Sequence, residues 1–417
     1  MFAAFSTALS ALDANGVAVD VVGNNLANLN TAGYKESAAY FSDLVSESLD
    51  AGQTQLGFGV ASPITIREFT QGAIQASSGS LDAAIQGNGF FVVNNNGETE
   101  YTRAGNFQVD LSGNLLTPTG QQVQGWMTTN GAVNTGAPIG NITVPVGALQ
   151  PPQATQNITL TANFNAAATP DSASSTASDW SAPVTVYDSL GTAHVVTISF
   201  AETAANTWSC TASIPGADVG ATSPQTIGTG TLTFGPDGKL LTPPAGSPIA
   251  LSVTGLSDGA ATPLNINWNI WNAAGTTATL TQFDQPSATS ANTQDGSAAA
   301  QMTGVTMSNG GQLLASYSNG QQAVVGEVAL ASIRNPQTLV AVGSNLFQVS
   351  AETGAPAVGA QGTGGRGTIV GGALESSNVD IAQELTELIV LQSAYQANAK
   401  VVTTVDTLAQ ATTNLIT

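Results

Sequence analysis

The C-terminal run, residues 374–417, is the feature that most constrains what this chain can fold into. From Asp380 onward it contains no Gly or Pro, and its apolar side chains recur at close to helical spacing. These apolar positions are Ile381, Leu385, Leu388, Tyr395, Val402, Val405 and Leu408. Ser376, Ser377 and Asn378 precede the run and are of the residue types that cap a helix start. One helix of about forty residues, roughly 60 Å long, exceeds the usual globular range and predicts coiled-coil packing against a partner.

Residues 1–30 offer that partner helix. Their apolar side chains follow a seven-residue pattern, with Gly16 and Gly23 at the remaining seam positions. The pattern consists of Phe2, Phe5, Leu9, Leu12, Val19 and Leu26. Each Gly weakens an isolated helix by about 1 kcal/mol relative to Ala, but it lets another backbone approach closely. We therefore predict that the terminal helices pair with each other and with neighbouring chains; the alternative is an ordinary helix pair that closes a globular core.

The composition is acidic and poor in charge. Of 417 residues 8% are charged, with seven Lys and Arg against 27 Asp and Glu, and the formal net charge is −20. Because the few basic residues are scattered, a nucleic-acid partner is excluded. No run of apolar residues is long enough for a membrane span, so membrane insertion is not expected. The N-terminus lacks the features of a secretory signal, so a chain acting outside the cell would need another export route.

The pattern along the chain predicts nested domains. Strand signals begin near Gly72, with a hairpin formed by residues 89–93 and 101–109. A composition shift at 146–155, beside several prolines, marks a boundary. Beyond it, Leu264, Ile266, Trp268 and Ile270 alternate with asparagines, which is typical of a sheet with one wet face. Strand patterns return at residues 324–333 and 339–349.

The expected fold class is therefore mixed α and β. Long terminal helices form a coiled-coil layer, and two mainly-β domains are nested one inside the other. The expected ranges are 1–30 and 375–417 for the inner helical domain, 31–71 for a connector, 72–145 and 299–374 for a split β-domain, and 146–298 for an inserted β-domain. A short helical piece is expected at 41–49, and a Gly-rich link at 354–372.

The sequence shows no set of residues that predicts catalysis or metal binding. His194 is the only histidine, and it shares strand parity with Val196, Ile198 and Phe200, so we expect a half-buried structural residue. Cys210 is the only cysteine and is expected to be a small buried hydrophobe, which excludes an intrachain disulfide. Without a second His or Cys, we predict no catalytic residue, no cofactor and no metal.

Two other patterns have ordinary explanations. Gly362, Gly364 and Gly367 match a dinucleotide-binding spacing, but no strand hands over to a helix there, so we interpret them as a linker. Glu384 and Glu387 lie three residues apart on the predicted C-terminal helix, and we interpret them as a solvated face.

Three blocks of the sequence resemble the axial-protein family of the bacterial flagellum, which comprises rod and hook subunits. The N-terminal block holds Leu9-Ser10-Ala11-Leu12, Asn24-Asn25-Leu26-Ala27-Asn28 and Asn30-Thr31-Ala32-Gly33-Tyr34-Lys35. The middle block holds Thr70-Gln71-Gly72, Leu81-Asp82-Ala83-Ala84-Ile85, Gly89-Phe90-Phe91-Val92 and Tyr101-Thr102-Arg103-Ala104-Gly105-Asn106-Phe107. The C-terminal block holds Leu374-Glu375-Ser376-Ser377-Asn378-Val379-Asp380, Glu384-Leu385-Thr386 and Tyr395-Gln396-Ala397-Asn398-Ala399-Lys400. Family members more often carry Ile at the position of Leu26 and Ala at that of Leu29.

The insert distinguishes the two branches of this family. Rod subunits are shorter, whereas Val186-Tyr187-Asp188-Ser189-Leu190-Gly191, followed by His194 and Trp208, resembles the outer domain of hook subunits. The resemblance therefore implies a structural hook subunit, not an enzyme, that assembles into a flexible curved tube outside the cell. Such a tube transmits motor torque from rod to filament as a universal joint. The alternatives are a distal rod subunit of the same family, or a secreted β-rich adhesin or enzyme.

The resemblance also implies contacts and partners. The apolar residues of both terminal helices would pack subunit against subunit. The family-motif residues are Asn24, Asn25, Asn28, Asn30, Thr31, Gly33, Tyr34, Ser377, Asn378, Asp380 and Asn398. The implied partners are further copies of the chain, the distal rod, hook-cap, hook-length-control and hook–filament junction proteins, and the flagellar type III export apparatus.

Overall fold

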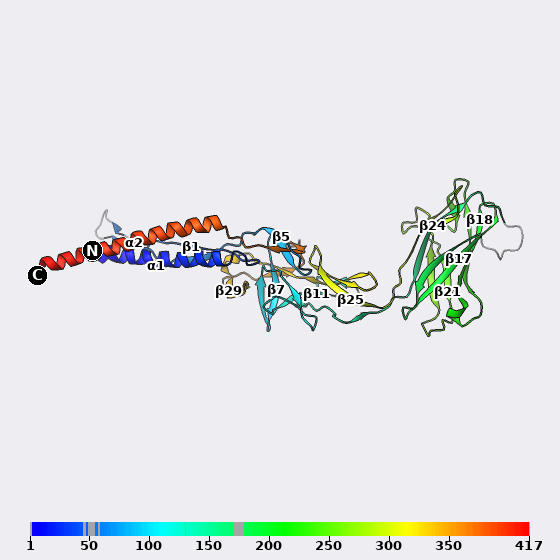
Figure 1. Ribbon diagram of the computed structural model, residues 1–417, viewed down its shortest axis with the longest axis horizontal. Helices are drawn as coiled ribbons and strands as arrows, with labels where there is room; N and C mark the ends of the chain where they lie inside the picture. The colour runs from blue at the N-terminus through cyan, green and yellow to red at the C-terminus, as the bar shows by residue number, and fades with distance from the viewer. Residues whose placement is uncertain are drawn as a thin grey trace. The chain divides into compact units, whose positions relative to one another are not determined.

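The computed structural model describes residues 2–44, 47–48, 55–56, 59–129, 131–170 and 179–416 (Figure 1). The chain divides into two compact units. Unit 1 contains residues 1–146, 304–316 and 322–417, and unit 2 contains residues 147–303 and 317–321. Both terminal helices and a β-rich body belong to unit 1, whereas unit 2 consists of strands and one short 3-10 helix.

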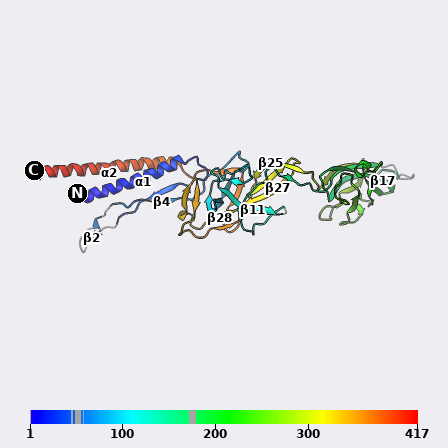
Figure 2. The same ribbon diagram turned by 90° about the horizontal axis from the view of Figure 1, so that it is seen from below.

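The predicted terminal helices are confirmed, and they lie side by side in both views (Figure 1, Figure 2). Helix α1 spans Phe2–Ala27 and helix α2 spans Ile381–Ile416. Their contact buries Ala18, Val22 and Leu391. The seam within the chain therefore buries fewer residues than the apolar pattern of the sequence contains, and Gly16 and Gly23 have no atom of another element within 4 Å of an added Cβ. Neither helix, over the residues described, is long and apolar enough to cross a membrane.

The segment after α1 is not the plain connector that the sequence suggested. Strand β1 (Ser37–Tyr40) pairs antiparallel with β4 (Ile64–Arg67), and Ala39 packs against the helix seam. The expected helical piece at 41–49 is wrong wherever the structure describes it: residues 41–44 form no helix, and β2 (Glu47–Ser48) pairs with β3 (Gln55–Leu56). Tyr40 and Ile64 face each other across the ladder, so β pairing prevails over a weak helical pattern.

The β-rich body of unit 1 contains a hairpin at the predicted place, but its second strand lies at residues 98–102 and not at 101–109. Strands β7 (Phe90–Asn95) and β8 (Glu98–Thr102) pair around a turn in which Asn96 and Gly97 have positive φ. The sheet runs β26-β27-β11-β7-β8-β30-β29, which brings the strands of residues 312–348 beside those of 90–129. The other bounds are β9 Gln108–Val109, β10 Leu115–Leu116, β11 Gln122–Thr129, β12 Ala132–Val133, β13 Gly140–Asn141, β26 Gln312–Tyr317, β27 Gln322–Val328, β28 Leu330–Ser332, β29 Val340–Gly343 and β30 Leu346–Gln348. Phe90, Tyr101 and Phe347 form an aromatic core beneath it.

Two short ladders connect this body to α2. Strand β5 (Ile74–Ala76) pairs with β33 (Ala373–Glu375), and β6 (Ala83–Gln86) pairs with β32 (Thr368–Gly371). The prediction of a linker at 354–372 was therefore wrong, because β31 (Ala357–Gly359) and β32 lie within it. The loop between them is closed by Arg366, whose guanidinium donates to the carbonyls of Ala357 and Ala360.

Unit 2 is a sandwich of two sheets around one core. The first sheet contains β15 (Asn157–Asn165), β21 (Ile249–Val253), β22 (Leu264–Asn269), β23 (Leu280–Phe283) and β24 (Ala288–Gln294). The second contains β16 (Trp180–Tyr187), β17 (Ala193–Ala204), β18 (Thr207–Ile214), β19 (Gln225–Phe234) and β20 (Leu240–Thr242). Outside these two sheets, the short strand β14 (Leu149–Gln150) pairs with the first residues of β25 (Ala300–Met307).

The core of unit 2 confirms the alternation seen in the sequence. Leu264, Ile266 and Trp268 point inward and the asparagines between them do not. Phe164 packs edge-to-face on Phe200, and its ring centroid lies 5.1 Å from that of Trp208. Cys210 is buried as expected, and burial raises the pKa of its thiol to about 12, which excludes a reactive thiolate.

Candidate functional site

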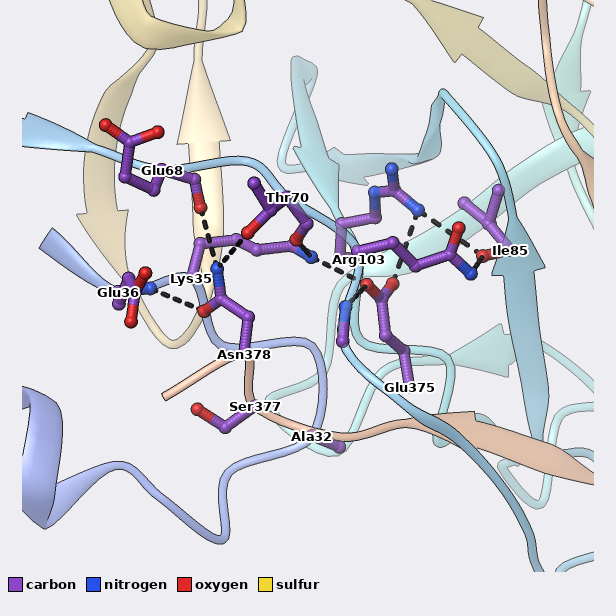
Figure 3. Close-up of polar contacts among 12 residues, drawn as sticks. Ala32, Lys35, Glu36, Glu68, Thr70, Ile85, Arg103, Glu375, Ser377 and Asn378 are labelled. Carbon is purple, nitrogen blue, oxygen red and sulfur yellow. Dashed lines mark hydrogen bonds and ion pairs between the residues drawn. The ribbon is translucent and has the colours of Figure 1, made fainter. Parts of the chain in front are cut away.

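Three charged side chains from distant parts of the sequence meet inside unit 1 (Figure 3). Lys35 follows α1, Arg103 follows β8, and Glu375 ends β33, just before α2. The Lys35 Nζ lies 2.6 Å from Glu375 Oε1, and Arg103 Nη1 lies 3.3 Å from Glu375 Oε2. Each side chain is at most 3% exposed, so these are ion pairs removed from water.

Backbone groups complete the coordination of these charges. Lys35 Nζ also donates to the carbonyl of Thr70 at 2.6 Å, and the N–H of Gly72 donates to Glu375 Oε1 at 3.0 Å. Arg103 donates to the carbonyls of Ile85 and Gly87. Burial lowers the pKa of Lys35 and of Arg103, and the Glu375 carboxylate opposes both shifts. Glu375 therefore favours the charged forms of Lys35 and Arg103. Without this carboxylate, burial would lower the pKa of each cation further.

Asn378 ties the same junction from the other side. Its Oδ1 accepts from the N–H of Glu36 at 2.8 Å, and its Nδ2 donates to the carbonyl of Glu68 and to Thr70 Oγ1 (Figure 3). The sequence had suggested that Asn378 caps α2. Its side chain instead binds residues that follow α1 in the sequence. The cap is Asp380, whose Oδ1 accepts from the N–H groups of Ala382 and Gln383.

Asn25 forms a second buried polar contact, between the helices. Its Nδ2 donates to Glu384 Oε1 and to the carbonyl of Ser37, each at 2.8 Å. Its Oδ1 accepts from the N–H of Ser37 and from the Tyr34 hydroxyl. One side chain near the end of α1 therefore fixes β1, the turn before it and the first turn of α2. Glu384 is 5% exposed, so its interpretation as part of a solvated face was wrong.

We expect replacement of Glu384 by Gln to stabilise unit 1 at neutral pH. Burial raises the pKa of Glu384 despite the bond from Asn25, with Glu387 and Glu36 adding to the rise, and Oε2 has no partner among the described groups. Because the folded pKa lies above the unfolded one, the folded chain binds more protons between them, and stability falls as pH rises through that interval. Gln keeps the bond from Asn25 and removes the charge.

The measurement is urea unfolding of the full chain and of Glu384→Gln at pH 4 and pH 7. The variant should be the more stable at pH 7, and its advantage should shrink at pH 4. The exposed Glu352→Gln, which is not among the groups that affect the pKa of Glu384, is the matched control. An advantage that did not change with pH would contradict the assignment.

Gly33 lies where the segment after α1 passes the end of β8. It has a φ of +68°, and its N–H donates to the carbonyl of Glu375 at 2.7 Å. A Cβ at this position would lie 2.6 Å from backbone atoms of Arg103 and Ala104. Only glycine can adopt this left-handed conformation without strain and also leave room for the backbone of Arg103 and Ala104.

The remaining motif residues have local roles. Thr31 Oγ1 donates to Asn28 Oδ1, and Asn28 Nδ2 donates to Asn24, which together close the turn after α1. Ser377 Oγ accepts from the N–H of Val379. Asn398 donates to the carbonyl of Ala394 within α2. Asn30 is exposed at the tip of the turn.

The residues predicted to pack between subunits lie largely on the outer faces of the helix pair. The exposed ones are Phe5, Leu9, Ile381, Leu385, Tyr395 and Leu408. Three residues are half-buried at the seam between the helices: Val19, Leu26 and Leu388. Three others are half-buried elsewhere on the helices: Leu12, Val402 and Val405. The side chain of Phe2 lies outside the described part of the structure. Packing between subunits stays a prediction.

The sequence reasoning assigned no role to Lys35, Arg103 and Glu375, although it quoted all three within family blocks. One signal could have found the two cations. The chain has only seven basic residues, and each of these two stands within a motif block. Lys and Arg are rarely buried unless they pair with an acid. Their common partner, 272 residues beyond Arg103, could not be found from spacing.

Four family models match the chain in the order of its parts. Residues 5–35 match "Flagella basal body rod protein", 84–163 match "Flagellar hook protein FlgE/F/G D1 domain", 153–297 match "Flagellar basal body protein FlaE D2 domain", and 370–415 match "Flagellar basal body rod FlgEFG protein C-terminal". A flagellar hook protein of Salmonella typhimurium is 33% identical, with 99% of each chain covered. The chain belongs to the flagellar hook protein family. The hook protein of Borreliella burgdorferi is 32% identical, with 98% of both chains covered.

A solved structure of the Helicobacter pylori hook protein FlgE2 shares the fold. It covers 71% of this chain and 99% of its own, with a TM-score of 0.52 at 14% identity. The two members of the Lys35–Glu375 pair belong to different family models. Lys35 is the last residue that the first model matches, and Glu375 lies near the start of the last model, which begins at residue 370. The buried junction is therefore where the N-terminal and C-terminal family segments meet in this chain.

Proposed function

We propose that this chain is the structural subunit of a flagellar hook, assembling with copies of itself into a tube. The proposal rests chiefly on full-length similarity to flagellar hook proteins. A second support is the apolar surface left on the helix pair, where Leu408 is 53% exposed and Ile389 64%. Burial of such surface against another copy would supply cohesion at about 25 cal/mol per Å². The family is a structural one, and we propose no enzymatic role for the chain.

Within this proposal the helix pair forms the inner layer around a channel, the β-rich body of unit 1 the middle layer, and the insert the outer layer. The tube acts as a universal joint, bending while it transmits torque from rod to filament. A surface with 8% charged residues offers few ion pairs that could lock one register between sliding neighbours. Export would follow the flagellar type III route, and the neighbours would be the rod, cap, length-control and junction proteins.

The deciding experiment is electron microscopy of basal bodies from a strain that lacks this chain. We expect complete rods that end without a hook, restored by a plasmid copy. Rods that end early would move the chain to the distal rod, the second candidate within the same family. Flagella of normal appearance would contradict both assignments, provided that the strain carries no second copy.

We expect the double replacement Leu9→Ser and Leu408→Ser to reduce polymerisation while leaving the monomer folded. Both side chains are largely exposed in the single chain, so their loss should change its stability by no more than about 0.5 kcal/mol. In a polymer that covers them, each would contribute about 1.5–3 kcal/mol. The critical concentration for assembly, measured by sedimentation, should rise at least tenfold. A matched control is Gln392→Ser, at an exposed polar position of α2.

A further inference from the structure

The sole histidine of the chain is surrounded by three aspartates in unit 2. His194 begins β17, and Asp188 lies in the turn before it. Asp218 belongs to the 3-10 helix η1 (Gly216–Val219), and Asp258 lies in the loop between β21 and β22. The imidazole is 5% exposed and the Asp188 side chain is fully buried, whereas Asp218 and Asp258 reach the surface, each about a quarter exposed. The histidine is more deeply buried than the half-buried residue that the sequence predicted, and its surroundings are not apolar.

The two nitrogens of the ring face different carboxylates. Nδ1 lies 3.1 Å from Asp218 Oδ2, while Nε2 lies 3.2 Å from Asp188 Oδ2 and 3.8 Å from Asp258 Oδ2. The ligand atoms of Asp188, His194 and Asp258 all lie within 4.8 Å of one another. A single Nε2 proton cannot satisfy two carboxylates that approach it together, and even a doubly protonated ring would leave two of the three negative charges unbalanced.

No basic side chain compensates this charge. The segment 147–303 contains one Lys and no Arg, and that residue, Lys239, is exposed and pairs with Asp237. Asp188 and Asp258 come close enough to share a hydrogen bond, so a proton between them offsets the repulsion of the two carboxyl groups. The geometry therefore places one imidazole nitrogen and two carboxyl oxygens around a position that a proton can share and that a divalent cation could occupy in its place.

We propose that Asp188, His194 and Asp258 bind a divalent transition-metal ion of the zinc class. One imidazole nitrogen and two carboxylate oxygens form the kind of three-ligand set that Zn²⁺ accepts, with water in the fourth position. Asp218 would hold the Nδ1 proton and leave Nε2 free to bind the metal, the usual arrangement of a carboxylate behind a metal-bound histidine. The imidazole favours Zn²⁺, Co²⁺ or Ni²⁺ over Ca²⁺ and Mg²⁺, which prefer oxygen ligands alone.

The site would connect three parts of unit 2 that are far apart in the sequence. Asp188 and His194 flank the turn between β16 and β17, and Asp258 comes from the β21–β22 loop of the other sheet. The partly exposed Asp258 gives the ion a route from solvent. A bound ion would therefore link the two sheets at one end of the sandwich. This inference concerns unit 2 alone and does not depend on the proposed function.

The test is titration of the purified full chain with ZnCl₂, followed by calorimetry and by ¹⁵N NMR of the imidazole. Because the chain has one histidine, the spectrum contains one imidazole and needs no assignment. We expect one equivalent to bind, the Nε2 resonance to move, and the Nδ1 proton to remain. Asp258→Asn should weaken binding at least tenfold. This variant keeps the acceptor for the N–H of Ala260, so the loop should stay folded. Asp218→Asn should weaken binding by roughly 10–100-fold, the range for an outer partner.

The matched control is Asp237→Asn, an exposed aspartate of the same unit outside the cluster, which should leave the affinity unchanged. Circular dichroism of each variant before titration separates loss of a ligand from loss of the fold. Binding that is equally strong in Asp258→Asn, or that leaves Nε2 unchanged, would refute the site. The site would also be refuted if no heat of binding were detected up to millimolar Zn²⁺ and the spectrum showed both ring nitrogens protonated. The cluster would then be an internal ion pair only. Tighter binding of Ca²⁺ than of Zn²⁺ would refute the zinc class.

Discussion

Replacing Glu375 by Gln is expected to cost about 3–5 kcal/mol of the stability of unit 1, because it leaves Lys35 and Arg103 buried without an anion. Gln has nearly the same size, so packing is preserved, and only the charge between the two cations is lost. Its amide would also place a donor beside Lys35 Nζ or the Gly72 N–H, which both donate to Oε1. Among the residues that the structure describes, Glu375 is the one acidic group that raises the pKa of Lys35 and of Arg103.

The loss is measured by denaturant unfolding of the full chain, together with hydrogen exchange of β5, β33 and the first turn of α2. Exchange there should accelerate, while the strands of unit 2 keep their protection, since the junction lies wholly in unit 1. Glu352→Gln, at an exposed position, is the control and should change the stability by no more than about 0.5 kcal/mol. A loss under about 1 kcal/mol for Glu375→Gln would mean that water reaches the cations and that the buried pairs are not what fixes the junction.

The junction matters because it joins the turn after α1, the β-rich body and the start of α2 at one place. Helix α2 begins only six residues after Glu375, and the turn after α1 ends at Lys35. The helix seam itself buries few large side chains, chiefly Val22 and Leu391 with Ala18 between them. An apolar contact of that size defines the angle between the two helices poorly. Ion pairs and hydrogen bonds from amide side chains are more directional, since they form only within a narrow range of distances and angles. The polar junction therefore determines where the helices leave the β-rich body.

Long-range periodicity made part of this fold predictable. The helical spacing of residues 381–416 and the alternation in β22 are repeated signals, and local turn chemistry at Asn96 and Gly97 fixed the first hairpin. Each is a property of neighbouring residues. The terminal helices were recognised for the same reason, although the fully buried residues of α1 at the seam are Ala18 and Val22, which the apolar pattern did not include.

The elements that were missed depend on partners far away in the sequence. Glu384 looked like a solvated residue because Glu387 lies three residues further along the same helix, and only Asn25, 359 residues earlier, gives it a buried partner. The glycines of residues 354–372 looked like a linker because the strand β32 is recognisable only through its pairing with β6. The aspartates around His194 come from a turn, a 3-10 helix and a loop, and no spacing rule relates them. Resemblance to a family located the blocks but did not reveal their contacts.

Replacing Gly33 by Ala is expected to cost about 3 kcal/mol or more and to prevent hook assembly. Ala in a left-handed conformation costs roughly 1–2 kcal/mol by itself. The new Cβ would also lie 2.6 Å from the backbone of Arg103 and Ala104, which cannot rotate away as a side chain could. Relief would require the turn to move, and movement would break the bond from the Gly33 N–H to the carbonyl of Glu375. The substitution therefore acts on the junction without removing any of its charged side chains.

A substitution at Gly372 separates the cost of the left-handed backbone conformation from the cost of the close contact. Gly372 lies in the same unit with a φ of +65°, and an added Cβ would have nothing within 4 Å. Gly372→Ala should lose only the conformational cost, about 1–2 kcal/mol, and should still assemble. Thermal unfolding and motility of strains with each variant provide the comparison. If the two variants lost equal stability, backbone strain alone would explain both, and close contact with the end of β8 would contribute nothing. A larger loss for Gly33→Ala, with faster exchange in β33 and α2, would establish that this contact holds the turn after α1 against the buried ion pairs.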